Sequence, residues 1–264
     1  MLVDSHCHLD FPELAADIDA ILDRMRENGV THALCVSVTL EDFPRVRALA
    51  ERHAQLYASV GVHPDYPEVP EVSVEELLRL AAHPRVVAIG ETGLDYHRIQ
   101  GECEWQRERF RRHIRAAREC GKPLIVHTRD AAADTLAIMR EEGADRAGGV
   151  MHCFTETWET AQAALDLGFH ISFSGIVTFK NARALKEVAQ RVPLARMLIE
   201  TDSPYLAPVP FRGKTNQPAL VKHVAEEIAR LTGESIERVG EVTSGNFFRL
   251  FGLKDEVQRH AGQG

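Results

Sequence analysis

The sequence lacks the features typical of membrane, disulfide-stabilised and zinc-ribbon proteins. No apolar run approaches the ~18 consecutive residues that a membrane helix needs. No basic and apolar signal segment precedes the first predicted strand, so we expect a cytoplasmic protein without membrane association. The five cysteines are scattered and form no C-x-x-C pair, which argues against a disulfide framework and against a zinc ribbon.

An excess of positive charge is also missing. The formal net charge is −8, which disfavours a protein that coats duplex nucleic acid through bulk electrostatics. The same charge is compatible with a local site in which bound metal ions supply the positive charge. The 13 histidines favour such metal chemistry, and nothing in the sequence indicates an obligate protein partner.

Strand-like and helix-like segments alternate along the chain. Strands are predicted at residues 2–6, 33–38, 57–62, 86–91, 123–127, 149–152, 170–174 and 197–202. Helices are predicted at residues 14–28, 43–52, 74–82, 104–120, 131–142, 158–167, 182–191 and 218–231. Eight strand–helix pairs in a chain of 264 residues, close to the ~250 typical of this barrel, predict an α/β fold, the TIM (β/α)8 barrel. A doubly wound open sheet is the alternative, but the Gly-rich phosphate turn after its first strand is missing.

The barrel accounts for residues 1–253 as a single domain, with extra helices at its C-terminal end. Residues 235–253 are predicted to hold two extra helical stretches, whose aromatic side chains pack against the barrel. Residues 254–264 form a polar tail that we expect to fray. No internal repeat, low-complexity tract or interdomain linker divides the chain.

The first predicted strand ends in two histidines, His6 and His8, which are two residues apart. Side chains alternate between the two faces of a strand, so both imidazoles project to the same side. Neutral imidazole is a common metal ligand, and the pair therefore suits a divalent ion. Taken alone, the pair also fits an ordinary strand that binds no metal.

Ligand-type residues recur at the carboxyl ends of the predicted strands, where enzymes built on this barrel carry their chemistry. Six of them come from five strands: His6, His8, Glu91, His127, His152 and Asp202. A single catalytic zinc typically uses three protein ligands. Six ligands suit two divalent ions about 3.5–4 Å apart, and mixed His and carboxylate ligands admit Zn²⁺, Mn²⁺ or Mg²⁺.

Glu91 is the expected bridge between the two ions, because it comes from a middle strand and is long enough to reach both. His6 and His8 then hold one ion, and the two later histidines hold the other. Asp202 completes the first site and can accept the proton of the attacking water. Glu91 and Asp202 are therefore the candidate catalytic residues.

Two further acidic residues, Asp4 and Glu200, share the strand parity of the ligands His6 and Asp202. An unpaired carboxylate inside a barrel would be costly. We therefore expect Asp4 or Glu200 to accept the free ring N–H of a ligand histidine and so fix its tautomer. A structural hydrogen bond elsewhere in the core is the alternative.

Candidate substrate contacts are less specific. Arg129 follows the fifth strand, and Arg212 and Lys214 lie in the loop after the eighth. Such cations could hold phosphates that flank the metals, although solvated loop charge is the alternative. His63 ends the third strand and is assigned to substrate contact, with a structural role as the alternative.

The segments around these residues resemble the TatD-type metal-dependent hydrolases of the amidohydrolase superfamily. The resemblance runs nearly end to end and rests on DSHCHLD (4–10), GVHP (61–64), GETGLDY (90–96), HTR (127–129), HCF (152–154), ETDSPYLAP (200–208), RGK (212–214) and NF (246–247). It implies a TIM barrel, one or two divalent metals on the same six ligands, and deoxyribonuclease activity, notably 3′→5′ exonuclease action on single-stranded DNA. The chain has Asn216-Gln217-Pro218 where the family often has Asn-Glu-Pro, a departure that concerns a distal contact.

Two other functions stay open. One is hydrolysis of a C–N or ester bond in a small molecule or an aminoacyl ester. Many such enzymes bridge their metals with a carbamylated lysine, but Lys122 and Lys180 do not stand at strand ends. The other is a non-catalytic metal-binding barrel, which the complete set of ligand positions disfavours.

Overall fold

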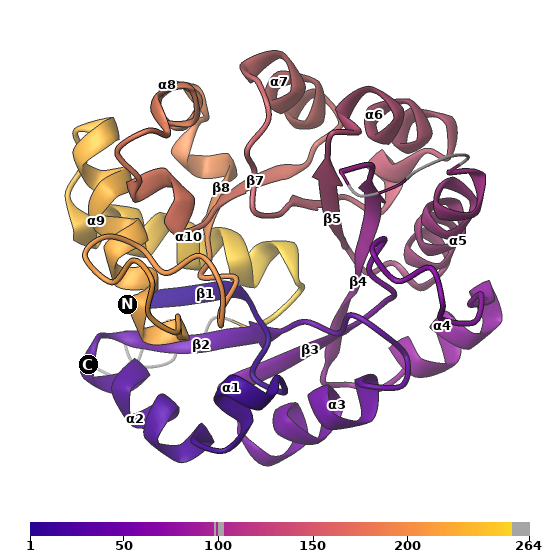
Figure 1. Cartoon of the computed structure of the whole chain (residues 1–264), viewed down its shortest axis with the longest axis horizontal. Coiled ribbons are helices and arrows are strands. Elements are labelled where there is room, and N and C mark those ends of the chain that lie inside the picture. Colours follow the sequence, from indigo (N-terminus) through magenta and orange to yellow (C-terminus); the bar gives the residue numbers. More distant parts are fainter. Residues whose placement is uncertain (98, 100–102, 255–264) are drawn as a thin grey trace.

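A computed structural model of the chain describes residues 1–97, 99 and 103–254. Eight parallel strands pair in chain order, and Figure 1 shows them enclosed by helices. They are β1 (Leu2–Cys7), β2 (Val30–Cys35), β3 (Leu56–Val60), β4 (Val86–Asp95), β5 (Leu124–Arg129), β6 (Gly149–Met151), β7 (His170–Phe173) and β8 (Met197–Ile199). The predicted TIM barrel is confirmed.

Helices follow the strands and cover the outside of the barrel. They are α1 (Pro12–Ala15), α2 (Ile18–Glu27), α3 (Phe43–Arg52), α4 (Val74–Ala81), α5 (Glu104–Cys120), α6 (Ala132–Glu141), α7 (Trp158–Asp166), α8 (Arg183–Arg191), α9 (Val221–Thr232) and α10 (Ile236–Leu250). Short 3-10 turns are η1 (Ala144–Arg146), η2 (Gly175–Thr178), η3 (Leu194–Arg196) and η4 (Pro218–Leu220). None of the helices in the described ranges is long and apolar enough to cross a membrane.

Two helix predictions differ from the structure. The helix expected at residues 14–28 is divided into α1 and α2, because Asp17 leaves the helical conformation between them. The two stretches expected at residues 235–253 form one helix, α10, which Ser235 caps by accepting a hydrogen bond from the Arg238 N–H. A glycine is needed at position 240 inside α10, because a Cβ there would lie 2.5 Å from the Met1 carbonyl oxygen. Apart from Lys254, the predicted polar tail lies outside the described residues.

The barrel closes where the chain beyond β8 returns to β1. The backbone N–H of Asp202 donates to the His6 carbonyl at 2.9 Å, and the N–H of His8 donates to the Ser203 carbonyl at 2.9 Å. The Asp4 carboxylate accepts hydrogen bonds from the N–H and hydroxyl of Thr201, at 2.9 and 2.5 Å. Closure therefore brings the first and last ligand segments side by side.

Helix α10 closes the amino-terminal end of the barrel. Phe247, Phe248 and Phe251 pack against strand residues that include Val3 and Leu198. Figure 1 shows α10 passing behind β1 and β8. A packed floor of this kind leaves the opposite end of the barrel, where the strands finish, available for chemistry.

Candidate metal centre

All six predicted ligands converge at the carboxyl ends of the strands. Two belong to or directly follow β1, and the others come from β4, β5, and the residues after β6 and β8. Five of them, all except the more deeply placed His6, line one cavity of about 890 Å³. The ends of distant strands thus supply one compact group of imidazoles and carboxylates.

Glu91 lies at the centre of this group and is only 2 % exposed. Its Oε1 lies 2.7 Å from His152 Nε2, 3.1 Å from His127 Nδ1 and 3.2 Å from His63 Nε2. Its Oε2 lies 3.2 Å from His6 Nε2. One carboxylate is therefore shared by imidazoles from four strands, which is the placement that a bridging ligand needs.

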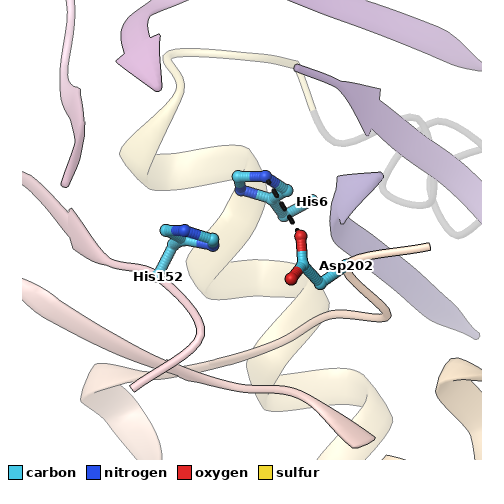
Figure 2. Close-up of side chains that lie close together, drawn as sticks. All are labelled: His6, His152 and Asp202. Carbon is cyan, nitrogen blue, oxygen red and sulfur yellow. Dashed lines mark ion pairs between the residues drawn. The ribbon is translucent and has the colours of Figure 1, made fainter. Parts of the chain in front are cut away.

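Asp202 lies on the β1 side of the group. Its Oδ1 is 3.4 Å from His8 Nε2 and 3.6 Å from His6 Nε2. Figure 2 shows the Asp202 carboxylate directed at His6, with the His152 ring beside it. The rings of His6 and His152 stack with centroids 3.9 Å apart. The first and sixth strands therefore contribute to the same half of the centre.

Three sets of ligand atoms each lie within 4.8 Å of one another: His6, His8 and Glu91; His6, His152 and Asp202; and His63, Glu91 and His127. The first set matches the expected grouping of His6 and His8 with the bridge. The second set places His152 with His6 and Asp202 rather than with His127, and the third set places His63 beside His127. The structure therefore gathers the expected residues but divides them differently.

Hydrogen bonds away from the centre assign the ring tautomers of two ligands. His8 Nδ1 lies 3.0 Å from the Val36 carbonyl oxygen, which can only accept a hydrogen bond. His152 Nδ1 lies 3.1 Å from the Glu200 carboxylate. With a proton on each Nδ1, each Nε2 presents a lone pair to the centre, as metal ligation requires.

His127 is oriented the other way round. Its Nε2 lies 3.0 Å from Asp95 Oδ2, and its Nδ1 faces Glu91. Asp95 therefore fixes the His127 tautomer that leaves Nδ1 as the ligand atom. The sequence offered a signal for Asp95 that was missed, because Glu91, Gly93 and Asp95 alternate along one face of β4.

His63 differs from the other histidines of the centre. Its Nδ1 accepts a hydrogen bond from the backbone N–H of Asp65 at 3.0 Å. Burial lowers the pKa of His63, and the neighbouring His127 lowers it further, although Glu91 acts to raise it. The ring is therefore neutral. A neutral ring that accepts at Nδ1 carries its proton on Nε2 and donates towards Glu91. This tautomer makes His63 a hydrogen-bond donor rather than a ligand.

The donor set fits divalent metal ions. Burial would raise the pKa of Glu91, but His152 and the other histidines hold it well below its usual range. Burial lowers the pKa of His6. The buried His152 Nε2 makes no hydrogen bond of acceptable geometry, although Glu91 is only 2.7 Å away. Against the effect of burial, Asp202 raises the pKa of His8, Asp95 that of His127 and Glu91 that of His152. These shifts reflect the excess of negative charge at the centre. Such negative charge and an unsatisfied ring nitrogen are the features of a site that holds a cation.

Glycine allows β4 to approach β5 closely enough to form the centre. Gly93 has φ +138°, and a Cβ there would lie 2.0 Å from the His127 carbonyl oxygen. Any side chain at Gly93 would push the two strands apart. The close approach brings Glu91 and Asp95 to opposite nitrogens of the same imidazole.

Glu200 and Asp4, which were expected to orient ligand histidines, occupy different surroundings. Glu200 reaches His152 Nδ1. Asp4 instead accepts from the backbone N–H of His6 and from Thr201, in the bonds that close the barrel. The reason is a register shift of β1 between Asp4 and Cys7, which breaks the parity with His6. Burial raises the pKa of Asp4 to about 8.

Of the three predicted substrate-binding cations, one lies at the cavity and two lie away from it. Arg129 lines the cavity. Arg212 instead stacks on the ring of Phe179, 3.6 Å from its centroid, and Lys214 lies 5.7 Å from the ring of Phe211. Neither of these two side chains lines the cavity, so the structure does not bring the Arg212–Lys214 loop to the centre.

A buried polar face of α5 supports the centre and was not predicted. Gln106 is fully buried, and its Oε1 accepts a hydrogen bond from the Asp95 N–H at 2.8 Å while its Nε2 donates to the Pro64 carbonyl at 3.1 Å. His113 Nε2 accepts from the Val62 N–H at 3.0 Å. These bonds fix the end of β4 and the segment that carries His63. Apolar periodicity could not reveal them, because it treats polar helix positions as exposed.

The chain resembles known proteins over nearly its whole length. The family model described as TatD related DNase matches residues 3–252. The metal-dependent hydrolase YcfH of Escherichia coli K12, named as uncharacterized, is 53% identical over 253 residues, which cover 95% of each chain. The 3′-5′ ssDNA/RNA exonuclease TatD of Enterobacter lignolyticus is 33% identical, covering 96% of this chain and 99% of its own.

A solved structure of a TatD homolog has the same fold. The crystal structure of YJJV, a TatD homolog from Escherichia coli K12, superposes with a TM-score of 0.89 at 29% identity. The superposition covers 96% of this chain and 98% of the other. The fold, the family match and the relatives agree. This chain is a member of the TatD family of metal-dependent hydrolases.

Proposed function

We propose that the chain is a deoxyribonuclease that removes nucleotides from the 3′ end of single-stranded DNA, using two divalent ions. The observation that carries the proposal is the position of Glu91, whose carboxylate lies within 3.2 Å of ring nitrogens from four histidines. A shared carboxylate of this kind suits a pair of ions that clamps the attacking and leaving oxygens of a phosphodiester. The relative named as a 3′-5′ ssDNA/RNA exonuclease supports the choice of substrate.

Four residues would hold the first ion: His6, His8, Asp202 and Glu91. Glu91 and His127 would hold the second, with His152 between the two halves. When bound, Zn²⁺, Mn²⁺ or Mg²⁺ would neutralise phosphate charge and lower the pKa of water.

The side chains of the protein supply the remaining steps. Asp202 directs Oδ1 at His6 and His8, which leaves Oδ2 to accept the proton of the attacking water. His63 lines the cavity beside Glu91, and we assign it to substrate contact through its Nε2–H. Arg129, at the end of β5, can pair with a flanking phosphate.

The arrangement disfavours a lysine-bridged amidohydrolase. Lys122 Nζ donates to the Val86 carbonyl at 2.5 Å, at the start of β4 and therefore far along the strand from Glu91. Lys180 lies on the surface outside the cavity. Glu91 occupies the shared position that a carbamylated lysine would need.

Cleavage of end-labelled oligonucleotides tests the proposal. The metal-free protein is titrated with Mn²⁺, Mg²⁺ or Zn²⁺ and given single-stranded DNA labelled at its 5′ end, alongside panels of amide and ester substrates. We expect a metal-dependent ladder that shortens from the 3′ end, and no ladder from Glu91→Gln. Turnover of an amide or carboxylic ester without any oligonucleotide cleavage would contradict the proposal.

A further inference from the structure

Aromatic residues stand at a fixed spacing from two residues of the metal centre. Phe11 is three residues after His8, and Tyr205 is three residues after Asp202. In each case the aromatic residue's N–H donates to the carbonyl of the earlier one, Phe11 to His8 at 3.2 Å and Tyr205 to Asp202 at 3.1 Å. Each ring is therefore held by a tight turn that begins at a ligand-type residue.

The two rings lie together at the mouth of the cavity, which both residues line. The Phe11 ring stacks on the His8 imidazole, with centroids 4.7 Å apart and an angle of 20° between the planes. The Tyr205 ring meets Phe11 nearly edge to face, at 6.2 Å and 71°. Tyr205 is 53 % exposed, which is unusual for a large aromatic residue and leaves a face of its ring open to a ligand.

The position of Tyr205 is fixed by a buried side chain. Asn216 is fully buried, and its Nδ2 donates to the carbonyls of Tyr205 at 2.6 Å and Thr201 at 2.9 Å. These bonds hold the turn on both sides of Asp202. The exposed ring thus belongs to a pre-organised segment, and binding to it would require little ordering.

Away from the bound ions, the side chains of this cavity offer little electrostatic affinity for a polyanion. Four carboxylates line it, those of Asp65, Glu91, Asp95 and Asp202. Among the described residues, Arg129 is the one lysine or arginine that lines it. The whole chain carries a net charge of −8. A nucleic acid would therefore need contacts that do not depend on charge, and stacking of bases on aromatic rings is the usual one for single strands.

The sheet order separates the aromatic pair from the arginine. Phe11 and Tyr205 follow β1 and β8, which are adjacent where the barrel closes. Arg129 ends β5, which lies across the barrel from these two strands in the sheet order. The ligand residues come from both of these sides and from the strands between them. A nucleotide could therefore place its base on the rings while an adjoining phosphate lies on the Arg129 side.

We propose that Phe11 and Tyr205 form a stacking platform for an unpaired nucleobase next to the scissile phosphodiester. This inference rests on the proposed function and names how that site selects its substrate. Stacking tolerates every base, because each has a π-face, but it requires the base to be free of its partner strand. The platform therefore selects unpaired ends without selecting sequence.

Steady-state kinetics on four matched oligonucleotides test the proposal. One is an ordinary single strand, and the other three carry an abasic nucleotide at each of the last three positions in turn. We expect Tyr205→Ala to raise KM for the ordinary strand by roughly tenfold, as loss of one base–aromatic stack would. On the strand whose abasic position removes the stacked base, the same substitution should change KM less than twofold. Tyr205→Phe keeps the ring and should behave as the wild type on every strand.

The outcomes separate this inference from the proposed function. Equal effects of Tyr205→Ala on ordinary and abasic strands, with wild-type cleavage intact, would overturn the platform and leave the nuclease standing. Absence of cleavage of any strand by the metal-loaded wild type would overturn both. A metal content that falls in Tyr205→Ala would also overturn the platform, because the ring would then act through Asp202.

Discussion

One buried polar side chain at each end of the barrel shows how differently the floor and the mouth are built. At the floor, the buried Asn246 donates to the Leu194 and Met197 carbonyls, both at 2.9 Å, and the phenylalanines of the same helix pack against apolar strand residues. At the mouth, His152 Nε2 is buried without a satisfactory hydrogen bond, and imidazoles crowd a single carboxylate. A satisfied polar group such as Asn246 stabilises the fold, whereas an unsatisfied nitrogen among ligand-type residues, such as that of His152, suits a place kept for a ligand. Stability and chemistry are therefore assigned to opposite ends of the same strands.

The largest effect is expected at the mouth, from Glu91→Gln. Losing the shared anionic ligand should lower kcat for oligonucleotide cleavage by at least about 10³-fold, since both metal sites lose a ligand. Added Mn²⁺ should raise the Tm of the wild type more than that of the variant, because each bound ion stabilises the native state. The Tm series separates metal loss from a purely catalytic defect, and an equal Tm rise in both proteins would contradict the bridging assignment.

The matching change at the floor is Phe247→Ala. Phe247 is fully buried against the inner strand residues, so its loss should lower the free energy of unfolding by about 3–5 kcal/mol. Urea unfolding measures this cost. The kcat/KM of the folded variant at low temperature should stay within twofold of the wild type. A large loss of activity in the folded variant would show that the floor and the mouth are coupled.

The polar face of α5 supports the mouth from outside the barrel and gives the stability a pH dependence. Burial lowers the pKa of His113 to about 4, below its unfolded value of 6.5. Its stabilisation is therefore complete above pH 6.5 and is lost as the pH falls towards 4, by roughly 3 kcal/mol in total. His113→Gln removes the titration while keeping an acceptor for the Val62 N–H. Urea unfolding at pH 7.5 and 4.5 should show a smaller pH difference in this variant, and an unchanged difference would contradict the prediction.

The smallest effects concern the cations at the mouth. Arg129 lines the cavity, so Arg129→Ala should raise KM for an oligonucleotide by about tenfold through the loss of a charge-assisted contact. Arg212 and Lys214 lie against aromatic rings outside the cavity, and replacing both should change KM less than threefold. The double variant serves as the matched control for Arg129. A larger effect in the double variant would show that the substrate extends along the loop after β8.

The strand ends were predictable from the sequence because alternation and the barrel topology act on every strand alike. His6, His8 and Glu91 could be placed together before any coordinates were known. Asp4 could not, because the register shift in β1 interrupts the alternation on which its placement relied. Gln106 also escaped prediction, since a buried polar residue on a helix looks like a solvent-facing one in sequence.

Which ligands group together around each ion depends on distances that the spacing of residues in the sequence does not determine. The His152 ring stacks on that of His6, although β1 and β6 are not neighbours in the sheet. The tautomer of His63 depends on one backbone N–H from Asp65. Such contacts follow from how the loops fold over the barrel, and only coordinates show them.

Counting bound metal most directly tests whether the mouth is a two-ion centre that shares Glu91. Metal-free protein is dialysed against Mn²⁺, and the metal bound per chain is measured by elemental mass spectrometry for the wild type and Glu91→Gln. We expect two ions per chain in the wild type and at most one in the variant. Two ions in both proteins, or none in the wild type, would contradict the shared-ligand centre.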